Sequence, residues 1–273
     1  MKILISVDIE GVAGVFHPEQ TRAGNPEYER ARRLMTAEAN AVIEGALAGG
    51  ASDILVNDSH GGFRNLLPDL LHPAASVILG KPRLLGMMSG VECGVDAVMM
   101  VGYHGRSQSR GILAHTINSF AFARVWLNDQ ELGETGLYGA LAGEFGVPVI
   151  FGSGDDVFVE EARMLYPQAH LVSVKTAQGN TSGISLSPQH TLTLLAEGAQ
   201  AAVETIHLAT TFVVAAPITC RLQTQTPALA DLFCQLPFLL RLDGVSVEFS
   251  APSVQYAVRV LNSLSAMSFM LRS

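Results

Sequence analysis

Nearly continuous apolar runs alternate with segments of helical periodicity along the first half of the chain. The runs lie at residues 2–8, 52–58, 95–103 and 147–154. An apolar run without polar alternation is typical of a strand buried on both faces of a parallel sheet. Strands separated by helices predict an α/β fold with a mainly parallel sheet flanked by helices.

The first predicted helix lies between the first two strands. Asn25, Pro26 and Glu27 combine a side chain that caps helices, a proline suited to the first helical position and an acid in the first turn. Apolar residues then recur at helical spacing until the glycine pair 49–50 ends the pattern. Further helices are predicted at residues 134–145, 155–166, 187–207 and 251–264.

Other segments have a weaker strand pattern. Residues 112–118 and 123–129 are predicted as two additional strands, in a hairpin or at the sheet edge, and residues 211–218 and 244–250 as strands of the C-terminal third. The chain contains no Pro/Ser-rich linker, internal repeat or low-complexity tract. We therefore expect residues 1–273 to form a single α/β domain, and the alternative is a smaller C-terminal subdomain that begins near residue 190.

Composition excludes several classes of protein. The 273 residues include 17 Lys+Arg and 25 Asp+Glu, so the net charge is −8, and only 15% of residues are charged while 48% are apolar. Such a chain is too apolar for intrinsic disorder. It has no basic cluster that could displace the counterions of a nucleic acid, so no nucleic-acid partner is expected. The low charge instead favours a homo-oligomer, in which a neighbouring subunit covers apolar surface.

Cysteine usage and the N-terminus bear on the cellular compartment. Cys93, Cys220 and Cys234 are an odd number without C-x-x-C spacing, which favours a reducing compartment over a disulfide framework. Asp8 and Glu10 interrupt the N-terminal apolar run before it could serve as a signal peptide. No run approaches the ~20 apolar residues of a membrane helix. We expect a soluble, cytoplasmic protein without a membrane partner.

Acidic and histidine side chains follow three of the predicted strands. The carboxyl ends of parallel strands meet at one edge of a sheet, where ligands bind. Carboxylates and imidazoles are ligands of Zn²⁺, Mn²⁺ and Co²⁺. A metal site is therefore predicted at this edge, and a glutamate that begins a predicted helix could complete it. The candidate ligands are Asp8, Glu10, His60, His104 and Glu134.

Each of these residues also has a simpler interpretation. An acid at a strand end often forms a turn or caps a helix, and Glu134 in a first helical turn is favoured by the helix dipole. Asp58 is expected to brace its loop or to orient His60. Asp155 is expected to cap the next helix, or else to help bind a substrate amine. His115 is either a core histidine or an acid–base group beside the metal.

Five separated motifs make the chain similar to a known family. The segments SVDIEG (6–11), NDSH (57–60), VGYH (101–104), LAHT (113–116) and GETG (133–136) resemble, in this order and at about this spacing, the zinc-dependent D-aminopeptidases of bacterial dipeptide-transport operons. The resemblance covers about the first 190 residues, and the C-terminal 80 residues carry no matching motif. It implies two zinc ions per subunit, with Asp8 bridging both, and a ring-shaped homo-oligomer, expected to be a decamer. Glu10, His60, His104 and Glu134 would complete the coordination, and His115 would be the catalytic residue.

The expected function is therefore that of a binuclear zinc aminopeptidase for short peptides with N-terminal D-amino acids. A metal-activated hydroxide would attack the peptide, assisted by His115 as a proton donor or acceptor or as a hydrogen-bond donor to the oxyanion. A binuclear phosphoesterase could use the same ligands, although only Arg64, Arg106 and Arg110 lie near the motifs. The third hypothesis is a binding or assembly protein without enzymatic activity, whose acids and histidines brace loops. The preference for D over L residues and the group that binds the substrate amine stay open.

Overall fold

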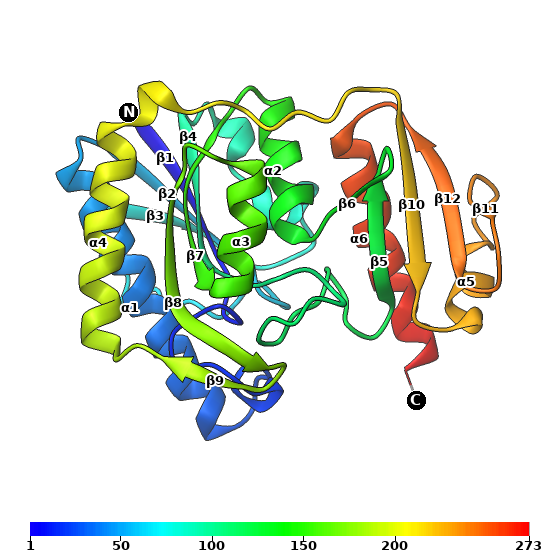
Figure 1. Cartoon of the computed structure of the whole chain (residues 1–273), viewed down its shortest axis with the longest axis horizontal. Helices are drawn as coiled ribbons and strands as arrows, with labels where there is room; N and C mark the ends of the chain where they lie inside the picture. Colours follow the sequence, from blue (N-terminus) through cyan, green and yellow to red (C-terminus); the bar gives the residue numbers. More distant parts are fainter. Residues whose placement is uncertain (273) are drawn as a thin grey trace.

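Two β-sheets lie side by side in the structure, a computed structural model that describes residues 1–272 (Figure 1). The larger sheet has seven strands in the order β3-β2-β1-β4-β7-β8-β9, and the smaller has five in the order β11-β12-β10-β5-β6. Helices α1 to α4 accompany the larger sheet, whereas α6 runs along the smaller one (Figure 1).

The larger sheet is parallel from β3 to β8, and only β9 runs antiparallel to its neighbour. All seven residues of β4 are buried, as expected for a strand covered on both faces. The prediction of an α/β fold with a mainly parallel sheet is therefore confirmed. The strands are β1 (Lys2–Val7), β2 (Asp53–Asp58), β3 (Ala75–Ile78), β4 (Ala97–Tyr103), β7 (Val149–Asp155), β8 (His170–Gly179) and β9 (Ser182–Ser185).

Helices cover both faces of the larger sheet because side chains alternate along its strands. Ile3 and Ile5 belong to a core shared with α1 (Pro26–Ala48) and α4 (Pro188–Glu204). Leu4, between them, belongs to the opposite core, shared with α2 (Glu134–Glu144) and α3 (Asp156–Leu165). The predicted start of α1 is confirmed, since the Asn25 side chain accepts a hydrogen bond from the amide of Tyr28 at 3.0 Å.

The smaller sheet is antiparallel and joins two distant parts of the chain. Its strands are β5 (Phe122–Leu127), β6 (Gln130–Glu131), β10 (Ile218–Thr224), β11 (Leu240–Arg241) and β12 (Ser246–Ala251), and α5 (Pro227–Phe233) and α6 (Val254–Met267) complete it. The hydroxyl of Tyr138 on α2 donates a hydrogen bond to Asn262 on α6 at 3.1 Å. Helix α6 therefore connects the smaller sheet to a helix of the larger one. Short 3₁₀ turns lie at Pro18–Gln20, Gly86–Met88, Val91–Cys93, Ile206–Leu208 and Ser268–Leu271.

Two predicted strands are wrong. Residues 112–118 form successive turns, in which Leu113 and Ile117 have φ values of 54° and 59°, outside the range of a strand. Their amides donate instead to Asn180 O at 2.8 Å and to Glu134 Oε1 at 2.5 Å. Residues 211–217 are not part of a strand either, and pairing begins only at Ile218, after a proline that has no amide hydrogen to donate.

None of the helices within residues 1–272 has both the length and the apolar character needed to cross a membrane.

Candidate metal centre

The ends of three neighbouring strands carry four of the predicted ligands to one place. Strands β2, β1 and β4 are adjacent and parallel, so the residues that follow them share one edge of the sheet. Asp8 and Glu10 follow β1, His60 follows β2, and His104 follows β4. Glu134 reaches the same edge as the first residue of α2.

Asp8 lies between two imidazoles. Its Oδ1 is 3.3 Å from His60 Nδ1, and its Oδ2 is 3.5 Å from His104 Nε2. Glu10 contacts only one of these rings, with Oε2 2.8 Å from His60 Nδ1. Asp8 and Glu10 are 2% and 5% exposed, so both carboxylates are withdrawn from water. Asp8 is therefore the central ligand candidate, with one oxygen available to each side.

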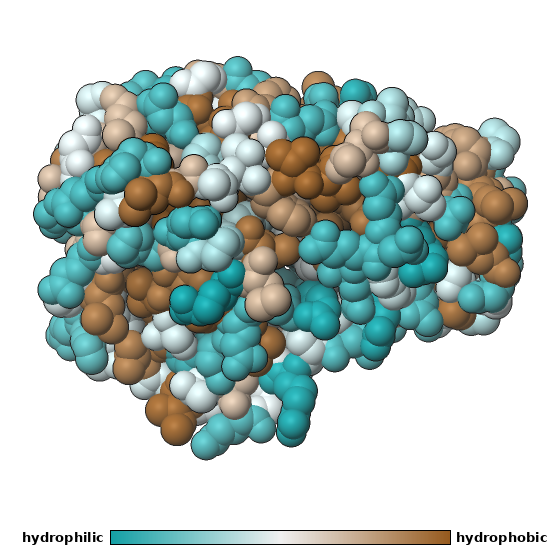
Figure 2. All heavy atoms as spheres, turned by 45° about the horizontal axis from the view of Figure 1, so that its top comes forward, coloured by the Kyte–Doolittle hydropathy of each residue, from teal (hydrophilic) through white to brown (hydrophobic). Residues whose placement is uncertain are grey.

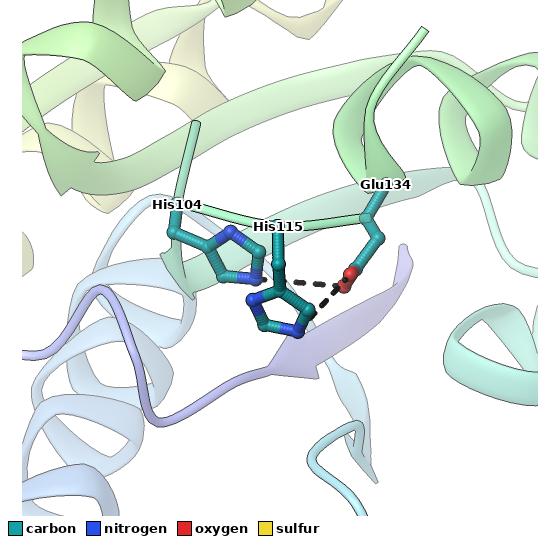
Figure 3. Close-up of side chains that lie close together, drawn as sticks. All are labelled: His104, His115 and Glu134. Carbon is teal, nitrogen blue, oxygen red and sulfur yellow. Dashed lines mark ion pairs between the residues drawn. The ribbon is translucent and has the colours of Figure 1, made fainter. Parts of the chain in front are cut away.

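His104, His115 and Glu134 form the other half of the cluster (Figure 3). The carboxylate of Glu134 lies beside the two rings, with Oε2 3.7 Å from His104 Nε2 and Oε1 3.6 Å from His115 Nε2. The imidazoles stack at a centroid distance of 4.2 Å and an angle of 13°. The turns at 112–118 bring His115 here, so all six predicted site residues meet at one edge of the sheet, although His115 does not come from a strand.

Charges within the cluster oppose the effects of burial. Burial alone would raise the pKa of Asp8, but the adjacent imidazoles of His104 and His60 hold that pKa well below its usual range. Burial would lower the pKa values of both imidazoles, but Glu10 and Asp8 raise the pKa of His60, and Glu134 and Asp8 raise that of His104 to about 10. Burial raises the pKa of Glu134. Each imidazole therefore holds a proton firmly unless a metal ion replaces it.

The donor atoms fit a divalent metal. Among residues 1–272, His104 Nε2 and Glu10 Oε2 are buried atoms without a hydrogen-bond partner, although a buried polar atom normally has one. Two overlapping groups of residues each bring three possible ligand atoms within 4.8 Å of one another. They are Asp8 with Glu10 and His104, and His104 with His115 and Glu134. Carboxylate oxygens and imidazole nitrogens at this spacing suit zinc.

Backbone carbonyls select the nitrogen that each imidazole turns toward the cluster. A ring nitrogen that donates to a carbonyl leaves the other nitrogen free as a metal ligand. Each of the three rings has such a partner on its outer nitrogen. The pairs are His60 Nε2 with Thr21 O at 3.0 Å, His104 Nδ1 with Gly105 O at 3.0 Å, and His115 Nδ1 with Leu113 O at 2.9 Å.

Two other acids considered in the sequence analysis, Asp58 and Asp155, accept hydrogen bonds from backbone amides and are not among the candidate ligands. Asp58 Oδ2 accepts the amides of Asn65 and Leu66 at 2.5 and 2.7 Å, which fixes the loop after His60. Asp155 caps α3 through the amide of Phe158 at 2.8 Å, and its second oxygen accepts another backbone amide. Neither carboxylate is free to bind a substrate amine.

Two buried charged side chains beside the cluster, Lys175 and Glu38, were missed by sequence analysis. Lys175 on β8 is 2% exposed, and its Nζ donates to the carbonyls of Glu10 and Val15, both at 2.5 Å. Glu38 on α1 accepts the amide of Ala13 at 2.8 Å. Burial lowers the pKa of Lys175 to about 8 and raises that of Glu38 to about 7. Each side chain holds the loop that carries Glu10 through backbone groups of that loop. The sequence offers no signal for a single lysine in a strand that was not predicted.

A cleft of about 990 Å³ opens over the cluster. Its lining includes Glu134 and His115, and residues Asn262, Ser265 and Ala266 of α6. The C-terminal part of the chain, which carries no recognisable motif, therefore supplies a wall of the site. The volume suits a small ligand such as a short peptide.

Comparisons with known proteins agree with this geometry. The sequence model of the D-aminopeptidase family, peptidase family M55, matches residues 1–263. A D-aminopeptidase of Bacillus subtilis (strain 168) is 36% identical over 197 residues, which is 72% of each chain. The solved structure of DppA from Bacillus subtilis, described as a Zn-dependent D-aminopeptidase and a self-compartmentalizing protease, superposes with a TM-score of 0.96 at 28% identity and covers 98% of both chains. The protein is therefore a peptidase that belongs to the D-aminopeptidase family.

Proposed function

We propose that this protein is an aminopeptidase that holds two zinc ions per subunit and removes N-terminal D-amino acids from short peptides. The observation that carries the proposal is the position of Asp8, which has one carboxylate oxygen beside His60 and the other beside His104. A carboxylate with ligands on both sides is suited to bridge two metal ions. The Zn-dependence of DppA supports the choice of metal, and the D-aminopeptidase relatives support the choice of substrate.

The remaining ligands divide between the two sides of Asp8. Glu10 and His60 would hold one ion, since Glu10 contacts His60 at 2.8 Å. His104 and Glu134 would hold the other, since they lie 3.7 Å apart. When bound, zinc supplies Lewis acidity that acidifies water and polarises the scissile carbonyl.

His115 is the proposed proton-transfer residue. Its side chain is 19% exposed and lines the cleft, whereas His104 is 1% exposed. The carbonyl of Leu113 holds Nδ1 at 2.9 Å, so Nε2 is the atom that faces the cluster. From this position Nε2 can take a proton, return it to the leaving amine, or donate a hydrogen bond to a developing oxyanion.

We further propose that the chain assembles into a homo-oligomer, and specifically a ring-shaped decamer. Support comes from apolar side chains exposed at the end of the molecule where β11 lies (Figure 2). Phe238, Leu240 and Leu242 in this segment are 47%, 62% and 44% exposed. DppA, the similar solved protein, is described as self-compartmentalizing. We propose the cytoplasm as the compartment, which is consistent with three free thiols.

The proposed activity is tested with D-alanyl-glycine and L-alanyl-glycine, assayed before and after zinc is removed by a chelator. We expect hydrolysis of the D-peptide to be at least about tenfold more efficient in kcat/KM, a difference of about 1.4 kcal/mol, because the proposed site reads the configuration beside the scissile bond. Chelation should abolish turnover, and added zinc should restore it. Equal rates that resist chelation would refute the proposal, and turnover of a generic phosphate ester in place of peptides would favour a phosphoesterase.

The bridging role predicts that Asp8→Ala loses more metal than Glu10→Ala. Asp8 contacts ligands on both sides, so its loss should remove both zinc ions, whereas Glu10→Ala should retain about one per chain because it serves one side. Metal content of purified variants, measured by mass spectrometry, checks this. Glu44→Ala, at an exposed position of α1, is the matched acidic control and should keep the wild-type content. Two tightly held ions in folded Asp8→Ala would contradict bridging.

The proton-transfer role predicts a purely kinetic defect in His115→Ala. We expect wild-type zinc content and melting temperature, and a kcat lower by roughly 10²–10⁴-fold with little change in KM. His190→Ala, exposed in the first turn of α4, should match the wild type. Loss of zinc together with activity would instead make His115 a metal ligand. A folded variant with more than about half of the wild-type kcat would show that the ring only packs.

The proposed assembly predicts a large species in solution. Sedimentation velocity at micromolar concentration should give a mass several times the 29.0 kDa of one chain, and about ten times this mass for a decamer. A single species at the monomer mass would rule the assembly out.

A further inference from the structure

Positive charge lines the cleft even though the chain carries a net charge of −8. Within residues 1–272, every charged residue of the lining is a cation, apart from the three candidate carboxylate ligands and the histidines of the cluster. The cations are Arg22, Lys81, Arg83 and Arg272. They differ from the three arginines that lie near the sequence motifs. One of those three, Arg106, is already paired with Glu161 at 2.7 Å.

Lys81 and Arg83 stand beside the segment that carries His60. Lys81 Nζ donates to the carbonyl of Gly61 at 3.0 Å, and Arg83 Nη2 donates to the carbonyl of Asp58 at 2.5 Å. The ring of Phe63 lies against both, with its centroid 3.9 Å from the Arg83 guanidinium and 5.9 Å from Lys81 Nζ. These contacts fix a cationic wall directly next to the candidate metal centre.

Neither cation of this wall has an anionic partner. Among the described residues, no carboxylate lies within 4.0 Å of Lys81 or Arg83, whereas Arg22 at the rim pairs with Glu19 at 2.7 Å. Lys81 uses one of its three ammonium hydrogens on Gly61, so two are left to donate. Arg83 is half-buried, and its Nε is a buried donor without a partner. A desolvated cation of this kind favours an anion supplied by a ligand.

We infer that Lys81, supported by Arg83, binds the free C-terminal carboxylate of the peptide substrate. The inference rests on the proposed peptidase function. A lysine that binds the terminal carboxylate would make the enzyme prefer short peptides with a free carboxyl end. Two extended residues span about 7 Å, so a dipeptide held at the cluster would bring its carboxylate near Lys81, which contacts the residue after His60. The cationic wall would fix the direction in which the peptide lies, with its free carboxylate toward Lys81.

The test compares D-alanyl-glycine with D-alanyl-glycinamide, which differ only in the terminal negative charge. The zinc-loaded wild type should hydrolyse the acid with a kcat/KM about 10-fold or more above that of the amide, the usual strength of a hydrogen bond to a charged group. Lys81→Met should remove this preference by raising KM for the acid, with kcat within about twofold and the amide unaffected. Lys81→Arg should keep the preference because it keeps the charge.

Arg64→Met is the matched control, because Arg64 is an exposed cation of the loop between β2 and β3 and does not line the cleft. It should leave the preference for the acid intact. Equal efficiency on acid and amide in the wild type would overturn the inference alone. Equal losses on both substrates in Lys81→Met would do the same, because they would indicate a purely structural role. Absence of turnover of both peptides by the wild type would overturn the proposed peptidase function and the inference with it.

Discussion

Three buried carboxylates at one edge of the sheet require positive charge, and the site is organised around this requirement. Asp8, Glu10 and Glu134 are each at most 5% exposed. An ionised carboxylate withdrawn from water costs several kcal/mol unless a cation or strong donors compensate it. Here the compensation comes from imidazoles, whose pKa values the carboxylates raise, or from divalent metal ions that take the place of those protons. The same arrangement therefore balances the buried charges and leaves donor atoms suited to a divalent metal ion.

The carboxylates and imidazoles meet because the backbone brings two strand ends close together. The amide of Gly11 donates to the carbonyl of Gly102 at 2.7 Å, and a Cβ at Gly11 would lie 1.8 Å from the carbonyl oxygen of Tyr103. Only glycine fits there, so the loop carrying Glu10 can press against the strand end carrying His104. Lys175 holds the same loop from β8 through two carbonyls. The larger sheet thus positions the candidate ligands through backbone groups and not through side-chain packing alone.

The sequence predicted the parts of this arrangement that depend on local pattern. Strands β1, β2, β4 and β7 are apolar runs, and four of the candidate ligands follow directly after three of them. Strand β8 was not predicted because it lacks a continuous apolar run and because one of its two buried residues, which are adjacent, is a lysine. The run at 112–118 gave a wrong strand because apolar residues in tight turns have the same composition as a strand. The cationic wall depends on a loop after β3, which was also not predicted, and on contacts that no local pattern encodes.

Helix α2 couples the candidate metal centre to the smaller sheet. Glu134 begins this helix and faces the cluster, and Tyr138, one turn later on the same side, donates to Asn262 of α6. The helix that positions the candidate ligand Glu134 therefore also contacts the C-terminal wall of the cleft. Helix α6 carries no sequence motif, but it lines the cleft and contacts the helix that carries Glu134. The smaller sheet, through α6, is thus part of the site's construction.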